Sequence, residues 1–297
     1  MRERKPSPEI AELREMVAAL ANQVTHLQRL AEKTHELVGP FGTPMPDGSM
    51  LVQTIYGTKY LIDPNDRVMA PQLIVYRQWE PDLSQLFLNT VTPDSVVIDV
   101  GANFGYFSCL AASKMGRSGT GQVWSFEPNP RLVPLLEDNC WRLNWSMAPI
   151  HLRPFAVGDH PGSVTLSVPR NGAANASLTN AGHDAENVSV ELVALDDVIP
   201  ADLQVDLMKI DVEGHELAVL RGAQNLIARS PSLHIVMEWS INQLRAAGTD
   251  AEDVIAFLAT AGLTTKHLPT SCHLADAVAF DPEELKTLTY ANIILTR

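Results

Sequence analysis

Apolar residues in the first part of the chain recur at alternating spacings of three and four. The series consists of Ile10, Leu13, Val17, Leu20, Val24, Leu27 and Ala31. A helix with this spacing presents a single apolar seam, formed by the a and d positions of a coiled coil. Residues 7–9 read Ser-Pro-Glu, which is typical of a helix start. We predict a heptad helix over residues 1–38 that associates with a second copy. Packing of this helix against its own domain is the alternative. Docking on a membrane surface is a weaker one, because the polar face is not notably basic.

Glycine and proline are frequent in residues 39–50 and predict a linker after this helix. Residues 51–63 then form two short β-rich runs with Gly57 at the turn between them, which predicts a β-hairpin. A helix is expected over residues 78–91. We expect the hairpin and this helix, over residues 51–92, to flank the sheet of one domain that extends over residues 51–297.

From residue 96 onward, short β-rich runs alternate with helical patterns. Strands are expected at 96–100, 122–127, 150–157, 205–212, 233–239, 264–268 and 291–296, and helices at 104–115, 130–144, 213–228 and 250–261. This alternation predicts an α/β fold with a mostly parallel sheet and helices on both faces. An antiparallel pair at 163–168 and 188–195, joined by the polar segment 169–187, interrupts the pattern.

Composition and charge narrow the classes of partner and compartment. The chain carries 22 Lys and Arg against 35 Asp and Glu, a net charge of −13, so a nucleic-acid partner is not expected. No window has the ~20 apolar residues of a membrane span, and the first ten residues lack the apolar core of a signal peptide. Three widely spaced cysteines favour reduced thiols. We therefore predict a cytoplasmic protein without a transmembrane segment.

Acidic side chains stand at the predicted carboxyl ends of the parallel strands, where open α/β sheets bind their ligands. Asp99 precedes a Gly-Ala-Asn-Phe-Gly turn at 101–105, and Glu127 ends the next strand. A dinucleotide site has the pattern G-x-G-x-x-G, which differs from this turn. An acid before the turn suits a cationic ligand better than a pyrophosphate, and Glu127 is placed to accept hydrogen bonds from ribose hydroxyls. S-adenosylmethionine, with a sulfonium, an amino group and a ribose, is therefore favoured as the cofactor.

Four sequence runs, in this order and spacing, resemble the FkbM-type S-adenosylmethionine-dependent methyltransferases. They are VVIDVGANFGYFS at 96–108, WSFEPNP at 124–130, FAVGD at 155–159 and LMKIDVEGHE at 207–216. The resemblance extends from about Tyr56 to the C-terminus and leaves out the heptad helix. It implies a class I methyltransferase fold and methyl transfer, usually to a hydroxyl of a sugar, a glycolipid or a polyketide.

The resemblance also implies which residues contact the cofactor. Gly101, Asn103 and Gly105 would line its methionine side and Glu127 its ribose. Asn129 and the stretch Phe155–Ala156 would lie near its adenine. Glu80 would approach from the N-terminal flank, and Asp99 precedes the turn. For Asn103 the alternative is a purely conformational role, because asparagine tolerates the left-handed backbone of tight turns.

Methyl transfer to an aliphatic hydroxyl benefits from a positioned base, because the hydroxyl is a poor nucleophile. Asp211, Glu213 and His215 are candidates where the fourth parallel strand enters its helix, and Glu238 at the tip of the next strand could pair with Asp211. Asp211 could act as the base, as an acceptor-binding group or as a metal ligand. For His215 the alternative is a surface position on the helix. We predict no metal, because a hard cation needs several converging oxygens that the sequence does not reveal.

The leading hypothesis is an O-methyltransferase that modifies a sugar or glycan-containing acceptor and forms a homo-oligomer through residues 1–38. An enzyme that methylates a polyketide, a peptide or another small natural product is the alternative. A more remote one is an assembly protein whose coiled coil organises partners and whose cofactor pocket is vestigial.

Overall fold

The computed structural model describes residues 42–144, 146–169 and 185–297. It also describes Leu13, Arg14, Met16, Val17, Leu20, Ala21, residues 23–25 and Leu27 in the N-terminal segment. The chain divides into two compact units, residues 1–41 and 42–297. All ten described residues of the first unit are helical. The outer positions of the predicted seam, Ile10 and Ala31, lie outside the described residues, and self-association stays a prediction.

The second unit is built on a seven-stranded sheet with the order β12-β13-β11-β10-β4-β5-β6. Its strands are β4 (Val96–Val100), β5 (Gln122–Phe126), β6 (Ile150–Arg153), β10 (Leu207–Ile210), β11 (His234–Ser240), β12 (Thr264–His267) and β13 (Tyr290–Thr296). Within the sheet, β13 alone runs antiparallel to its neighbours, β11 and β12. A parallel sheet of this order with one reversed strand near its edge is the class I methyltransferase arrangement, as predicted.

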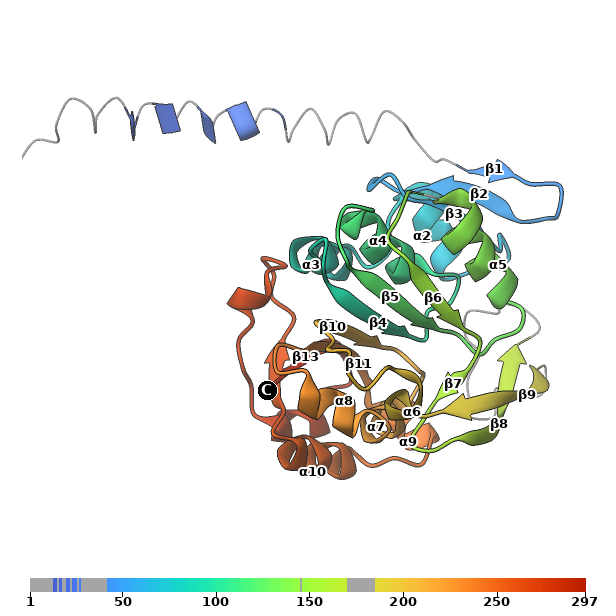
Figure 1. The fold of residues 1–297 in the computed structure, drawn as a ribbon, viewed down its shortest axis with the longest axis vertical. Coiled ribbons are helices and arrows are strands. Elements are labelled where there is room, and N and C mark those ends of the chain that lie inside the picture. The colour runs from blue at the N-terminus through green and yellow to red at the C-terminus, as the bar shows by residue number, and fades with distance from the viewer. Residues whose placement is uncertain are drawn as a thin grey trace, which may run out of the picture. The chain divides into compact units, whose positions relative to one another are not determined.

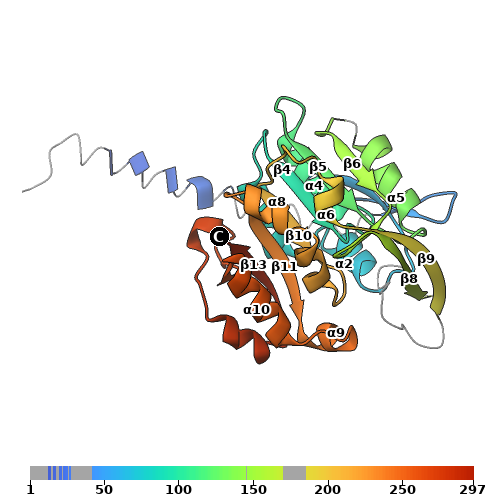
Figure 2. The same ribbon diagram turned by 60° about the horizontal axis from the view of Figure 1, so that its bottom comes forward.

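Helices cover both faces of this sheet (Figures 1 and 2). One group comprises α2 (Met69–Val75), α3 (Pro81–Thr90), α4 (Tyr106–Met115) and α5 (Val133–Glu137). The other comprises α6 (Leu195–Val198), α7 (Glu216–Arg221), α8 (Gln224–Arg229), α9 (Ile241–Ala246) and α10 (Ala251–Ala261). Two apolar clusters follow from the two-residue period of the strands: Val97 packs with the first group, and Val96 and Ile98 pack with the second.

Several predicted elements are divided by residues that break regular structure. The strand expected at 150–157 is two strands, β6 and β7 (Ala156–Val157), because Pro154 cannot donate to a ladder. The helix expected at 130–144 is α5 followed by a π-helical segment, Asp138–Leu143. The helix expected at 213–228 is α7 and α8, which are separated at Gly222, where a Cβ would lie 1.9 Å from the Gly158 carbonyl oxygen. Helix α2 was not predicted.

The antiparallel pair predicted at 163–168 and 188–195 is part of a small second sheet. Strands β8 (Gly162–Pro169) and β9 (Ala185–Val193) pair in antiparallel register, and β7 pairs with β9. The polar residues between Pro169 and Ala185 lie outside the described part of the chain. Short 3₁₀ helices at Leu274–Asp276 and Pro282–Lys286 precede β13.

The predicted N-terminal hairpin is present and begins earlier than expected. Strands β1 (Thr43–Pro44), β2 (Met50–Gln53) and β3 (Lys59–Ile62) form an antiparallel sheet, so the predicted linker at 39–50 contains β1 and the first residue of β2. Tyr60 of β3 stacks on Tyr106 at 5.4 Å and donates to its carbonyl oxygen at 2.9 Å. The hairpin is thereby attached to α4. No helix within the described residues is both long and apolar enough to span a bilayer.

Candidate active site

The carboxyl ends of the central strands surround a cavity of about 260 Å³. Of the residues predicted for the site, eight line it: Glu80, Gly101, Asn103, Glu127, Ala156, Asp211, Glu213 and Glu238. The cavity lies at the edge of the sheet where open α/β folds bind their ligands. The structure does not place four other predicted residues in its lining: Asp99, Gly105, Asn129 and His215.

The turn after β4 keeps its shape through glycine and backbone hydrogen bonds. Gly101 has a left-handed backbone with φ +83°, and its amide donates to the Phe126 carbonyl oxygen at 3.0 Å. A Cβ on Gly101 would lie 1.9 Å from the carbonyl oxygen of Asp211, so no other residue fits without moving backbone. At Gly105 a Cβ would instead meet Leu136 at 2.6 Å. Gly105 therefore allows α4 to pack against α5.

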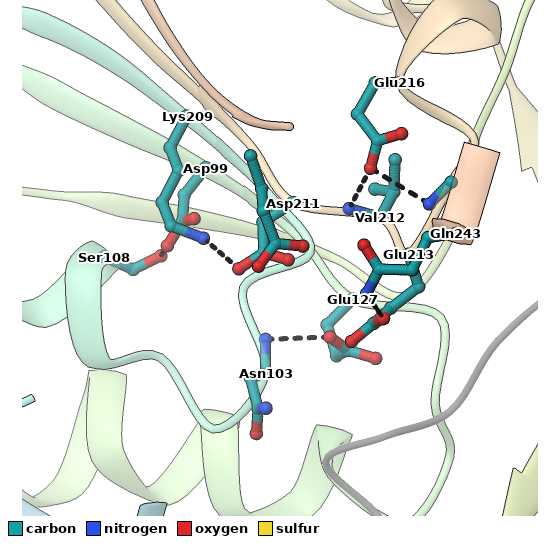
Figure 3. A network of polar contacts seen from close by, with 12 residues as sticks. Asp99, Asn103, Ser108, Glu127, Lys209, Asp211, Val212, Glu213, Glu216 and Gln243 are labelled. Atoms are coloured by element: carbon teal, nitrogen blue, oxygen red, sulfur yellow. Dashed lines mark hydrogen bonds and ion pairs between the residues drawn. The ribbon is translucent and has the colours of Figure 1, made fainter. Parts of the chain in front are cut away.

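Glu127 anchors this turn from the neighbouring strand. Its carboxylate accepts from the amide of Asn103 through Oε2 and from the amide of Asn129 through Oε1, both at 2.8 Å. Burial raises the pKa of Glu127 to about 7, although the two amide donors oppose that rise. Asn129 accepts from the Arg131 amide at 3.0 Å and supports the start of the following helix. Glu127 thus presents a carboxylate to the cavity while holding the turn in place (Figure 3).

Asp99 lies beneath the cavity lining. It is 1% exposed, and its Oδ2 accepts from the Ser108 hydroxyl at 2.6 Å. Burial raises the pKa of Asp99, and the ammonium of Lys209 on the adjacent strand opposes that rise. Asp99 therefore supports the floor of the site.

The loop after β10 brings two carboxylates to the opposite wall. Asp211 accepts from the Lys209 ammonium at 2.7 Å through Oδ2, and Glu213 accepts from the Gln243 amide of α9. Burial raises the pKa of Glu213 to about 7, and the neighbouring Asp211 raises it further. A Cβ on Gly214 would lie 2.4 Å from the Gln243 carbonyl oxygen, so this loop also packs directly on its neighbour.

A third carboxylate, Glu238, comes from the tip of β11. Tyr290, the first residue of β13, donates its hydroxyl to Glu238 Oε1 at 2.7 Å. Burial raises the pKa of Glu238 to about 8, with a further contribution from Asp211. Its Oε2 is buried and has no hydrogen-bond partner among the described residues. That oxygen is available to a donor in the cavity.

His215 is set apart from these acids. It is the N-cap residue of α7, and burial lowers its pKa. Neighbouring Glu216 caps the same turn by accepting from the Gly214 amide at 3.1 Å. Of the four predicted catalytic residues, three therefore line the cavity, Asp211, Glu213 and Glu238, and His215 does not.

Strained backbone is concentrated around the cavity. Five non-glycine residues in the described part of the chain have positive φ, and three of them line it: Glu80 (39°), Asn103 (56°) and Glu213 (56°). Such conformations persist where the surrounding structure enforces them, which is common at functional sites. Glu80 also has a pKa raised by burial. The predicted turn role of Asn103 and its place in the cavity are thus both observed.

A family model described as the methyltransferase FkbM domain matches residues 99–264. The chain belongs to the FkbM methyltransferase family. Hexuronic acid methyltransferase AglP of Haloferax volcanii is 29% identical over 189 residues, which cover 63% of this chain and 71% of that protein.

Solved structures are more distantly similar to this FkbM methyltransferase. A methyltransferase FkbM from Methylobacillus flagellatus KT is 16% identical with a TM-score of 0.40, covering 69% of this chain and 44% of that chain. A putative transferase, PH0793, from Pyrococcus horikoshii is 11% identical with a TM-score of 0.42, covering 84% and 71%. The fold assignment therefore stands on the strand order and the family match.

The cavity of this FkbM methyltransferase fits the methyl donor of its family, S-adenosylmethionine. Gly101 and Asn103 of the turn after β4 line it, and Glu127 provides a buried carboxylate beside them. Carboxylates predominate over cations in the lining, which suits a sulfonium. The described residues contain no group of three His, Cys, Asp or Glu able to hold a metal ion.

Sequence reasoning missed several lining residues of the FkbM site. Lys209 and Tyr290 are the polar ones, and Trp79, Tyr106 and Phe107 contribute aromatic surface. The two-residue period of a strand places Lys209 on the same side as Asp211, so that contact was readable in the sequence. The contact between Tyr290 and Glu238 could not be read from the sequence, because it depends on the antiparallel pairing of β13 with β11.

Proposed function

We propose that the chain transfers the methyl group of S-adenosylmethionine to a hydroxyl of a sugar in a glycan-containing acceptor. One observation carries this proposal: a single cavity joins the Gly101–Glu127 corner, suited to a nucleoside, to a wall of carboxylates suited to hydroxyl donors. The similarity to a protein named hexuronic acid methyltransferase supports a sugar acceptor.

The residues divide between the two ends of the cavity. Gly101, Asn103 and Glu127 would hold the cofactor, with Ala156 beside its adenine and Glu80 approaching from α3. When bound, S-adenosylmethionine supplies the methyl group: the acceptor oxygen forms the O–CH₃ bond as the S–CH₃ bond breaks, and sulfur keeps the electron pair.

The chain's own contribution at the other end is to bind the acceptor and take its proton. Lys209 occupies Oδ2 of Asp211, which leaves Oδ1 as an acceptor for a substrate hydroxyl. Glu238 Oε2 offers a second acceptor in the same cavity. We assign Asp211 as the base, with Glu213 and Glu238 orienting the sugar, because a positioned base is worth about 10²–10⁴-fold in rate.

Calorimetric titration tests the cofactor half of this proposal. S-adenosylmethionine and its demethylated product are both expected to bind saturably with one site per chain. If neither binds, the proposed function is wrong.

The acceptor half is tested by incubating the protein and labelled cofactor with separated glycan, lipid and small-molecule fractions of a cell extract. Label in a sugar-containing product supports the proposal, whereas label only in a polyketide or peptide contradicts the proposed acceptor.

We further propose that the N-terminal helix joins two or more copies of the chain. Its described apolar side chains are 47–64% exposed: Leu13, Met16, Val17, Leu20, Val24 and Leu27. Covering this seam with a second copy would remove that surface from water. Light scattering is expected to show an oligomer for the full chain and a monomer after deletion of residues 1–38. Leu20→Glu should dissociate the oligomer without deletion, and a monomeric full chain would contradict the proposal.

A further inference from the structure

Lys209 is a buried cation in the middle of the sheet that the roles assigned above leave unexplained. It lies on β10, is 4% exposed, and faces Asp99 across the parallel pairing of β10 with β4. Its ammonium lies 5.1 Å from the ring of Phe107 on α4. A lysine rarely occupies such a position without a charged partner.

Carboxylates from three segments surround the Lys209 ammonium. Asp99 comes from β4, Asp211 from the loop after β10, and Glu80 from the residue before α3. Burial alone would lower the pKa of Lys209, but these three acids together raise it above its ordinary value. The acids around the ammonium therefore favour its charged form.

The ammonium binds Asp211 in preference to Asp99. Lys209 Nζ and Asp211 Oδ2 are 2.7 Å apart, whereas Asp99 Oδ2 is bound by Ser108 and Asp99 Oδ1 has no partner among the described residues. Figure 3 shows Lys209 beside Asp99 with its ammonium turned to Asp211. Asp211 is 32% exposed at its side chain, so one carboxylate oxygen is fixed from below while the carboxylate remains accessible.

Lys209 is also the one cation among the described residues that line the cavity. The acids and phenol that interact with Asp211 are Glu80 from the segment before α3, Glu127 after β5, Glu213 from the same loop, Glu216 from α7, Glu238 from β11 and Tyr290 from β13, with Asp99 beneath. Without a positive charge among them, like charges this close favour protonation of one or more carboxylates.

We propose that Lys209 is a positioning residue that holds one oxygen of the Asp211 carboxylate and supplies the positive charge beside it, so that Asp211 can take the proton of the acceptor hydroxyl. This inference rests on the proposed methyl transfer. Lys209 does not touch the acceptor in this role; it acts through Asp211.

The charge at position 209 should therefore set the acidic limb of the pH–rate profile. We expect Lys209→Met and Lys209→Gln to lower kcat by about 10–100-fold and to move the acidic limb to higher pH. Lys209→Arg keeps the charge and is expected to keep the wild-type limb with a smaller loss of kcat. The substrate is the extract fraction that the wild-type protein labels. Lys209→Gln serves the comparison if Lys209→Met does not fold.

Two results would overturn the role of Lys209. One is an acidic limb that coincides in the neutral variants and the wild type, or that moves equally in Lys209→Arg. The other is a calorimetric affinity for S-adenosylmethionine that weakens in step with kcat, since this would make Lys209 structural. Wild-type protein that neither binds the cofactor nor labels any fraction would instead refute the proposed function, which keeps the two failures distinguishable.

Discussion

Gly101→Ala is expected to destabilise the domain by about 2–5 kcal/mol and to abolish measurable binding of S-adenosylmethionine. The new Cβ would lie 1.9 Å from the Asp211 carbonyl oxygen, and both groups are held by backbone hydrogen bonds of the sheet edge. Relieving that overlap must separate the turn after β4 from the loop after β10. Because the turn also lines the cavity, the strain and the loss of binding have the same cause. Urea unfolding and calorimetric titration measure the two effects.

Gly262→Ala is the matched control for this change. Gly262 follows α10 in the left-handed conformation, with φ +66° and ψ 33°, and a Cβ there would meet no atom within 4 Å. The substitution therefore carries only the conformational cost of a left-handed residue, about 1–2 kcal/mol, and should leave cofactor affinity unchanged. Equal cofactor affinity in Gly101→Ala and Gly262→Ala would show that the contact with Asp211 does not matter for the site.

Glu127→Gln is expected to weaken binding of S-adenosylmethionine by about 10–100-fold. A loss of this size corresponds to about 1.5–3 kcal/mol, which is the typical contribution of hydrogen bonds to a charged group. The variant loses the ionised acceptor for the ribose hydroxyls. It also turns one of the two oxygens that accept from Asn103 and Asn129 into an amide donor, which faces a backbone N–H. Glu191→Gln, on the exposed side of β9, is the control and should bind like the wild type.

The same residue gives the affinity a pH dependence. The unliganded pKa of Glu127 is about 7, and ribose hydroxyls bind the ionised form, so wild-type affinity should rise as pH increases through 7. The contribution of Glu127 to the free energy of unfolding without cofactor instead falls as pH increases. A carboxyl whose folded pKa is raised stabilises the fold below its ordinary value of 4.5, and this contribution is lost as pH rises through about 7. Glu127→Gln should show a shallower rise in affinity, because Glu213 and Glu238 still titrate. A slope identical to that of the wild type would mean that Glu127 does not meet the cofactor.

The sheet and the acids at its carboxyl edge could be predicted because both follow from local sequence. Alternating β-rich and helical runs specify a parallel sheet, and side chains that follow each strand necessarily meet at one edge. Asp211 and Glu127 were found in this way. Which of the acids face the cavity was not predictable, because it depends on where each strand ends. Asp99 lies inside β4, opposite Ser125, whereas Glu127 follows the last residue of β5.

The contributions that were missed depend on where a strand lies in the sheet or on a pairing distant in sequence. A lysine in a strand suggests a surface position, yet β10 is central and buried on both faces, so Lys209 points into the floor of the site. Tyr290 reaches Glu238 only because β13 inserts antiparallel beside β11. Such long-range pairings depend on global topology, which the short periodic patterns of one sequence do not encode.

The two close backbone contacts at the sheet edge restrict how this enzyme can be remodelled. The turn after β4 touches the loop after β10 at Gly101, and that loop touches α9 at Gly214. Three successive segments are thus interlocked, so grafting one of them alone from a related protein would create backbone collisions. An exchange intended to change the acceptor should transplant all three together, or confine itself to the second sheet formed by β7, β8 and β9, which adjoins the cavity through β7 and Leu166 without these contacts.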